Sequence, residues 1–234
     1  MLQIKRVMET HDVRFWGLLQ GCPGFGAAIW EKRLLESFSW DWGCYFAWKG
    51  GHAAAFAKGE GSGICCGSLN EKTLLPFFHI NGLSFVTCPK NSPGSFHSEQ
   101  WGMVMTHPGG KLNLPPLDGE IASCYRLLKE SVPNFSVPFE RYYWEMSLRR
   151  RKGAGQVYRK EQAMAALSFT PFGALLSQVA TSPAARRQGQ CSRLITQLCS
   201  GTPGPIYLFC LPELADFYKT LSFSTIGYWR NLLL

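Results

Sequence analysis

Apolar residues recur at helical spacing in some stretches of the chain and form short continuous runs in others. The helical spacing predicts helices over residues 12–20, 27–38, 70–78, 120–130 and 139–150. Short runs rich in β-branched and aromatic residues predict strands over 43–48, 53–57, 64–66, 83–87, 100–105, 156–160, 163–169, 174–180 and 206–210. This alternation of helices with strands predicts an α/β protein.

Residues 174–200 carry the most informative pattern, because an apolar strand is followed there by a proline turn, a cationic loop and an amphipathic helix. One apolar face of that helix holds Cys191, Leu194, Ile195 and Leu198. The loop Arg186-Arg187-Gln188-Gly189-Gln190 precedes the first turn, whose backbone N–H groups have no partners inside the helix. Free N–H groups, the helix dipole and two arginines together predict a site for a phosphorylated ligand. Glycine allows the backbone to approach a pyrophosphate closely.

Two motifs in this region resemble those of the GNAT superfamily, the acetyl-coenzyme A-dependent N-acetyltransferases. Val179-Ala180-Thr181-x-Pro183 followed by Arg186-x-x-Gly189-x-Cys191 resembles motif A, which is written Arg/Gln-x-x-Gly-x-Gly/Ala. Residues 215–223, ADFYKTLSF, resemble the later segment A-x-x-Y-x-x-x-G-F. The sequence departs from the family at Cys191 and at Ser222, where small residues replace the usual Gly or Ala, and at Leu211, where an Asn is frequent.

The resemblance implies a GNAT fold, a mixed central sheet flanked by helices, over residues 120–234. Residues 1–110 show a similar order of elements without the motif A signature, and we expect them to form a degenerate GNAT-like domain. Residues 107–116, with three prolines and two glycines, are the best candidate for a linker between the two domains. Residues 58–63, KGEGSG, predict a hairpin turn, because no phosphate-binding Lys-Ser/Thr follows them.

For the site, the resemblance implies that acetyl-CoA binds along the end of the strand and the start of the helix. A backbone N–H near Val179 and Ala180 would support the thioester carbonyl, and Thr181 would contact the pantetheine arm. The pyrophosphate would lie on the N–H groups of Arg187, Gln188, Gly189, Gln190, Cys191 and Ser192, beside Arg186. Tyr218 would protonate the departing thiolate as the catalytic acid, since a phenol with a pKa of about 10 is protonated at neutral pH. The alternative for Tyr218 is a packing role on the apolar face of its helix.

The general base stays open among Glu140, Glu145, Glu161 and a water relay. Cys191 is an alternative nucleophile, because helix N-termini favour thiolates, but the family transfers the acetyl group directly. The acceptor, a primary amine, stays open among a small metabolite, an antibiotic, a peptide terminus and a lysine.

The net charge of +8 lies wholly in the second half of the chain. Residues 1–120 hold ten Lys+Arg and ten Asp+Glu, whereas residues 121–234 hold fourteen and six. A basic half attracts an anionic ligand such as coenzyme A, and it also keeps a protein in solution. The run Arg149-Arg150-Arg151-Lys152 is most simply a solvated helix end, and it could alternatively bind the 3′-phosphate of coenzyme A.

The cysteines and the apolar runs of the chain predict its redox environment and whether it has a metal or a membrane partner. Nine cysteines without any C-x-x-C pair argue against structural zinc and a disulfide framework, so we expect a reduced, cytoplasmic protein with no metal. No apolar run is long enough for a transmembrane helix, and the first fifteen residues lack the apolar core of a signal peptide, so no membrane partner is expected.

Two other functions remain open. The departures at Cys191, Leu211 and Ser222 would suit a CoA-binding pseudoenzyme or regulatory module. A basic nucleic-acid-binding protein is suggested by the pI of 9.1 and the run at 149–152, but the aromatic residues lie in apolar runs and no nucleic-acid motif is present.

Overall fold

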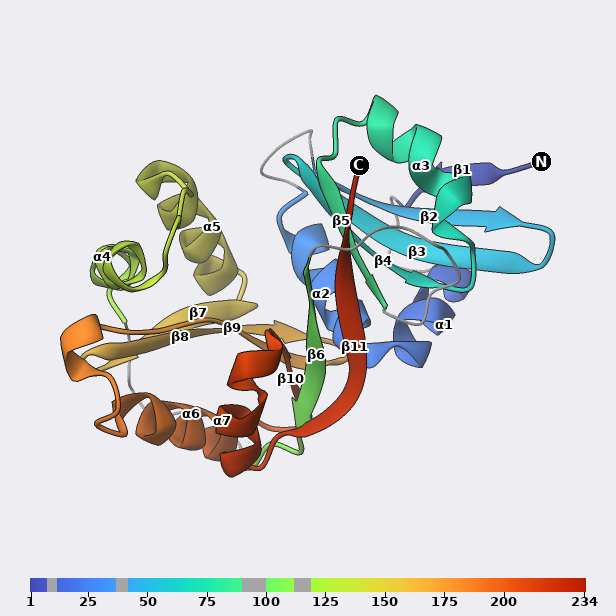
Figure 1. Cartoon of the computed structure of the whole chain (residues 1–234). Coiled ribbons are helices and arrows are strands. Elements are labelled where there is room, and N and C mark those ends of the chain that lie inside the picture. Colours follow the sequence, from blue (N-terminus) through green and yellow to red (C-terminus); the bar gives the residue numbers. More distant parts are fainter. Residues whose placement is uncertain (8–11, 37–41, 90–99, 112–118) are drawn as a thin grey trace. The chain divides into compact units, whose positions relative to one another are not determined.

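Each half of the chain contains three consecutive antiparallel strands (Figure 1). The computed structural model describes residues 1–7, 12–36, 42–89, 100–111 and 119–234. These residues divide into two compact units. The first unit contains 1–105, 209–215 and 225–234, and the second contains 106–208 and 216–224.

The elements of the first half of the chain are β1 (Gln3–Arg6), α1 (Val13–Gly21), α2 (Pro23–Leu34), β2 (Gly43–Lys49), β3 (His52–Gly59), β4 (Ser62–Gly67), α3 (Glu71–Ile80) and β5 (Phe85–Pro89). In the first unit the strands are ordered β1-β2-β3-β4-β5-β11-β6, where β6 is Gln100–His107 and β11 is Ser224–Leu233. The strand β5 runs parallel to β4 and antiparallel to β11. The helix α3 covers one face of this sheet through Leu74 and Phe78, and α1 and α2 lie on the other (Figure 1).

The second half repeats the same order of elements. After β6 it continues with α4 (Ile121–Ser131), α5 (Phe139–Arg151), β7 (Gly155–Lys160), β8 (Ala163–Thr170), β9 (Gly173–Thr181), η1 (Pro183–Ala185), α6 (Gln190–Gly201), β10 (Ile206–Cys210), η2 (Pro212–Leu214), α7 (Ala215–Thr220) and β11. The helices α4 and α5 cover one face of β7–β9 and α6 covers the other (Figure 1). The expected α/β class is confirmed, and the two halves share the similar order of elements that the sequence predicted.

The predicted elements form with small shifts at their ends. The helix predicted at 27–38 begins earlier, at Pro23, because proline suits the first turn of a helix. The strand β1 had no prediction, since a short edge strand of alternating polar and apolar residues gives little signal. Residues 58–63 form the end of the β3–β4 hairpin, with Glu60 and Gly61 in its turn, so the predicted hairpin turn is confirmed. In the proposed linker, residues 112–116 lie outside the described residues, while Gly110 bridges to Pro203.

The division into consecutive domains at 1–110 and 120–234 stays a prediction. The compact units are not continuous stretches of the sequence, because the segments 209–215 and 225–234 belong to the first unit.

Candidate functional site

An irregular strand leads into the predicted loop. β9 pairs antiparallel with β8, with Ala166 opposite Ser177 and Met164 opposite Ala180, so the register shifts between these pairs. The shift makes a β-bulge at Gln178, whose φ of 52° lies in the left-handed region. The backbone groups of Gln178 and Val179 therefore fall outside the regular ladder. Among the described residues, the buried side-chain oxygen of Gln178 also has no donor.

The edge of β9 that faces away from β8 is unpaired over most of its length. β9 runs parallel to β10, and the two strands pair only at Ala174–Ile206 and Leu175–Tyr207. The rest of β9 extends to Thr181 beyond this pairing. Parallel strands that separate in this way leave backbone N–H and C=O groups available to an extended ligand between them.

The helix α6 begins with its N–H groups uncovered. Gly189 is its N-cap, with a φ of 73°, and no side chain caps the helix. The first of its N–H groups to bond is that of Arg193, which donates to the carbonyl of Gly189 at 3.0 Å. Within the described part of the chain, the N–H groups from Gln188 to Ser192 have no acceptor. Free N–H groups at the positive end of a helix dipole are the kind of arrangement to which anions bind in proteins.

The side chain of Arg186 fixes the loop to the body of the second unit. Its guanidinium donates to the carbonyl of Ser131, at the end of α4, over 2.9 Å. The hydroxyl of Ser182 donates to the carboxylate of Glu130 over 2.7 Å, which ties the residue that follows β9 to the same helix. Both arginines are exposed, but Arg186 positions the loop through this bond, whereas the side chain of Arg187 makes no hydrogen bond or ion pair among the described residues. Arg187 adopts a φ of 63°.

A second set of contacts joins the loop to the turn between β7 and β8. Arg193 donates to the carbonyl of Gln188 over 3.2 Å and forms an ion pair with Glu161 at 3.2 Å. The side-chain oxygen of Gln190 accepts the N–H of Gln162 over 3.0 Å. No sequence pattern indicated these supporting contacts, because no motif relates the turn at 161–162 to the loop.

Cys191 lies in the first turn of α6 and is half-buried. Burial raises the pKa of its thiol, while a hydrogen bond with Thr181 works in the opposite direction. A raised pKa leaves little thiolate at neutral pH, which argues against Cys191 as a nucleophile.

Tyr218 is separate from this continuous segment and lies on α7. The side chain is 7% exposed, and its ring packs against Phe217 and Phe223 at centroid distances of 5.1 and 5.7 Å. Its carbonyl accepts the N–H of Phe223, and the carbonyl of Lys219 accepts the N–H of Ser222, so α7 ends in a Schellman motif. Ser222 is the left-handed residue of this motif, with a φ of 65°.

Two of the candidate bases are engaged by arginines. Glu145 pairs with Arg141 at 3.0 Å and with Arg149 at 3.9 Å, and Glu161 pairs with Arg193 as described. The run at 149–152 is not wholly a solvated helix end, because Arg149 is only 6% exposed and Arg150 donates to the carbonyl of Gly119 over 3.0 Å.

Neither a metal centre nor a membrane span is found in the described parts of the chain. No three His, Cys, Asp or Glu side chains gather there in a way that could hold a metal ion. None of the helices described is both long and apolar enough to cross a bilayer.

Solved structures with the same arrangement of elements decide the fold. A GCN5-related N-acetyltransferase from Sphaerobacter thermophilus superposes with a TM-score of 0.56 over 98% of this chain and 94% of its own, at 9% identity. A tandem GNAT protein from the clavulanic acid biosynthesis pathway gives a TM-score of 0.52, covers 99% of this chain and 97% of its own, and is 9% identical. The chain has a tandem GNAT fold. A Drosophila protein is similar over 99% of this chain and 98% of its own, with a TM-score of 0.58 and 8% identity. No protein-family model matches the sequence, and no curated protein does.

The two GNAT-like halves differ at the helix that follows the third antiparallel strand. In the first half the short turn before α3 ends at Asn70, whose side chain accepts the N–H of Lys72 over 2.9 Å, while its carbonyl accepts the N–H of Thr73. A helix capped by its own preceding residue leaves fewer N–H groups for a ligand. Only the second half therefore combines an uncapped helix with a cationic loop in the described residues.

Proposed function

We propose that this protein is an N-acetyltransferase that moves an acetyl group from acetyl-CoA directly to a primary amine. The observation that carries the proposal is the row of unsatisfied N–H groups from Gln188 to Ser192, beside Arg187 and behind a bulged strand. A pyrophosphate supplies the acceptors that these donors lack. The GNAT fold of the chain supports the same assignment.

The remaining parts of the cofactor fit the neighbouring backbone. The open edge of β9 beyond Leu175 offers N–H and C=O groups to the amides of the pantetheine arm. Near the bulge, a backbone N–H of Val179 or Ala180 would stabilise the thioester oxygen as it gains negative charge. Thr181, already hydrogen-bonded to Cys191, would border the arm.

Proton transfers complete the reaction. The amine must lose a proton before it attacks the carbonyl carbon, and the departing thiolate must gain one. We assign the second transfer to the hydroxyl of Tyr218. With Glu145 and Glu161 held in ion pairs, Glu140 and a water relay stay the candidates for the base.

Thermal melting with and without acetyl-CoA tests the binding step. Binding to the folded state alone raises its stability by about 2.7 kcal/mol at a hundredfold excess over the dissociation constant. Gly189→Glu should abolish the shift, because it places a bulky anion at the pyrophosphate position. Gly50→Glu is the matched control, since Gly50 also has a positive φ of 55° but lies in the β2–β3 turn with nothing near its Cβ position. A full shift in Gly189→Glu would refute the assignment of the loop.

A CoA-binding pseudoenzyme is the second candidate. Leu211, at the position where the family frequently has Asn, precedes η2 and makes no side-chain cap there. An assay of acetyl-CoA consumption against a panel of amines separates the two functions. Binding without transfer to any amine would favour the pseudoenzyme.

A further inference from the structure

Two cysteines from distant parts of the sequence meet inside the first unit. Cys22 lies between α1 and α2, at the start of α2, and Cys66 lies on β4. Their thiols are hydrogen-bonded to each other. The neighbouring Cys65 packs on the opposite face of β4, in the core with Leu74 and Phe78 of α3.

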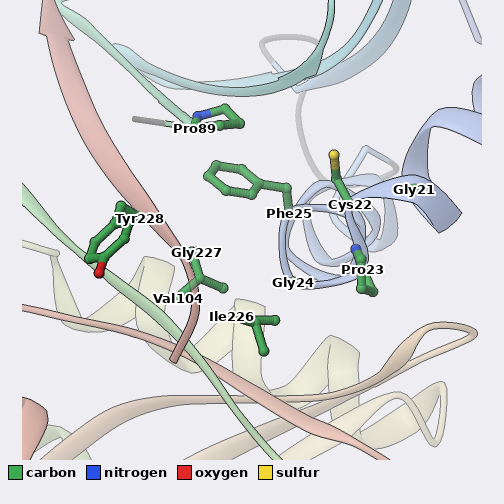
Figure 2. Close-up of a pocket in the computed structure, with 10 residues that line it drawn as sticks. All are labelled: Gly21, Cys22, Pro23, Gly24, Phe25, Pro89, Val104, Ile226, Gly227 and Tyr228. Atoms are coloured by element: carbon green, nitrogen blue, oxygen red, sulfur yellow. The ribbon is translucent and has the colours of Figure 1, made fainter. Parts of the chain in front are cut away.

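Cys22 also lines a pocket of about 200 Å³ within the first unit. Figure 2 shows Cys22 and Phe25 at the start of α2, with Val104 and residues 226–228 of β11 on the other side. The lining residues carry no charged side chain, and Tyr228 is the one titratable residue among them besides Cys22. Cys22 borders this uncharged pocket and is partly exposed, whereas Cys66 is only 2% exposed, so Cys22 is the more accessible of the two thiols.

The two thiols differ in their pKa values. The hydrogen bond from Cys66 lowers the pKa of Cys22 to about 7, although partial burial opposes this effect. The same hydrogen bond, with burial, raises the pKa of Cys66 well above its usual range, so Cys66 keeps its proton and acts as the donor. Burial raises the pKa of Cys44, Cys124, Cys191, Cys199 and Cys210 instead. The thiolate is the reactive form, and its position at the start of a helix favours it further.

We propose that Cys22 and Cys66 form an oxidisable dithiol that takes a small hydroperoxide as its substrate and closes to a disulfide. The Cys22 thiolate attacks one peroxide oxygen, so an S–O bond forms, the O–O bond breaks, and the departing oxygen takes a proton to leave as water or an alcohol. The sulfur of Cys66 then attacks the sulfenic acid of Cys22. An S–S bond forms, the S–O bond breaks, and water leaves with the proton of Cys66. The peroxide is reduced and the two thiols are oxidised.

Peptide mapping of the full-length protein tests this site. Reduced protein is treated with one equivalent of hydrogen peroxide at pH 7, blocked with an alkylating agent and digested without reductant. We expect the peptide containing Cys22 to be joined to the peptide containing residues 65 and 66, and fragmentation between these two residues should place the bond on Cys66. The bond should persist in Cys65→Ser, the matched control, and disappear in Cys66→Ala. In Cys66→Ala the remaining Cys22 thiol should react with peroxide more slowly, and with excess peroxide its sulfenic acid should be trapped by dimedone.

Alkylation rates provide a second, independent readout that needs no oxidant. In the wild type, Cys22 should react at pH 7 at least about tenfold faster than in Cys66→Ala. Without the donor its pKa rises, and the loss of thiolate exceeds the gain in nucleophilicity. Cys22 reacting no faster than the buried thiols, a bond to Cys65, or bonds only between chains would each overturn the proposal.

Discussion

Ser222 shows how one residue stores backbone strain at the end of α7. It occupies the left-handed position of the Schellman motif, with a φ of 65°, where glycine has no steric penalty. Ser222→Gly should raise the free energy of unfolding by about 1 kcal/mol, because the relief of strain exceeds the added entropy of the unfolded chain. Urea denaturation measures the change. Ser224→Gly, in β11 where φ is not positive, is the control and should not stabilise the protein.

Tyr218 is the residue at which a catalytic and a packing role can be separated. Tyr218→Phe keeps the ring contacts with Phe217 and Phe223 but removes the hydroxyl proton. If the hydroxyl protonates the thiolate, kcat should fall about a hundredfold or more while acetyl-CoA affinity and the melting temperature stay near wild type. Steady-state kinetics with an acceptor found in the amine panel measures this. Turnover within about threefold of wild type would leave Tyr218 a packing residue, and Tyr228→Phe in the first unit is the control.

Two adjacent arginines in the loop before α6 have different proposed roles: Arg186 positions the loop and Arg187 binds the ligand. The side chain of Arg187 makes no hydrogen bond or ion pair among the described residues, so Arg187→Ala should weaken acetyl-CoA binding about tenfold without lowering the melting temperature of the free protein. Arg186 bonds to the carbonyl of Ser131, so Arg186→Ala should lower both affinity and melting temperature. Calorimetric titration at two salt concentrations, with thermal melts of the free proteins, separates the effects. Equal melting temperatures in both variants would contradict a positioning role for Arg186.

At the scale of secondary-structure elements, the sequence predicted the features that depend on residues close together in the chain. The helical spacing of Leu194, Ile195 and Leu198 predicted α6, and all three side chains are fully buried. The bulge at Gln178 was not visible, because neither glycine nor proline marks it and its register depends on β8. The same limit applies to Arg149, which sequence alone placed at a solvated end. Its burial depends on packing around α5 that no short pattern encodes.

At the scale of the whole molecule, the last strand of the chain completes the first unit. β11 pairs antiparallel with β5, from Trp229 opposite Pro89 to Leu233 opposite Phe85. The hydroxyl of Thr87 also donates to the side-chain oxygen of Asn231 over 2.7 Å. Pairing between residues so far apart in the sequence leaves no local signal, which is why the expected domain division assigned this strand to the second half.

This pairing predicts that residues 1–110 do not fold alone. Leu232 is fully buried in the core of the first unit beside Val86 and Cys88, so a chain that ends at residue 110 exposes that core and an unpaired edge of β5. The fragment should show little cooperative unfolding and should bind a dye for exposed apolar surface. In the full chain, Leu232→Ala should cost about 2–5 kcal/mol, as expected for a large-to-small change in a core. Leu233→Ala, at a position 47% exposed on the same strand, is the matched control and should cost far less. A fragment 1–110 with a sharp melting transition would show instead that the first unit is stable without β11.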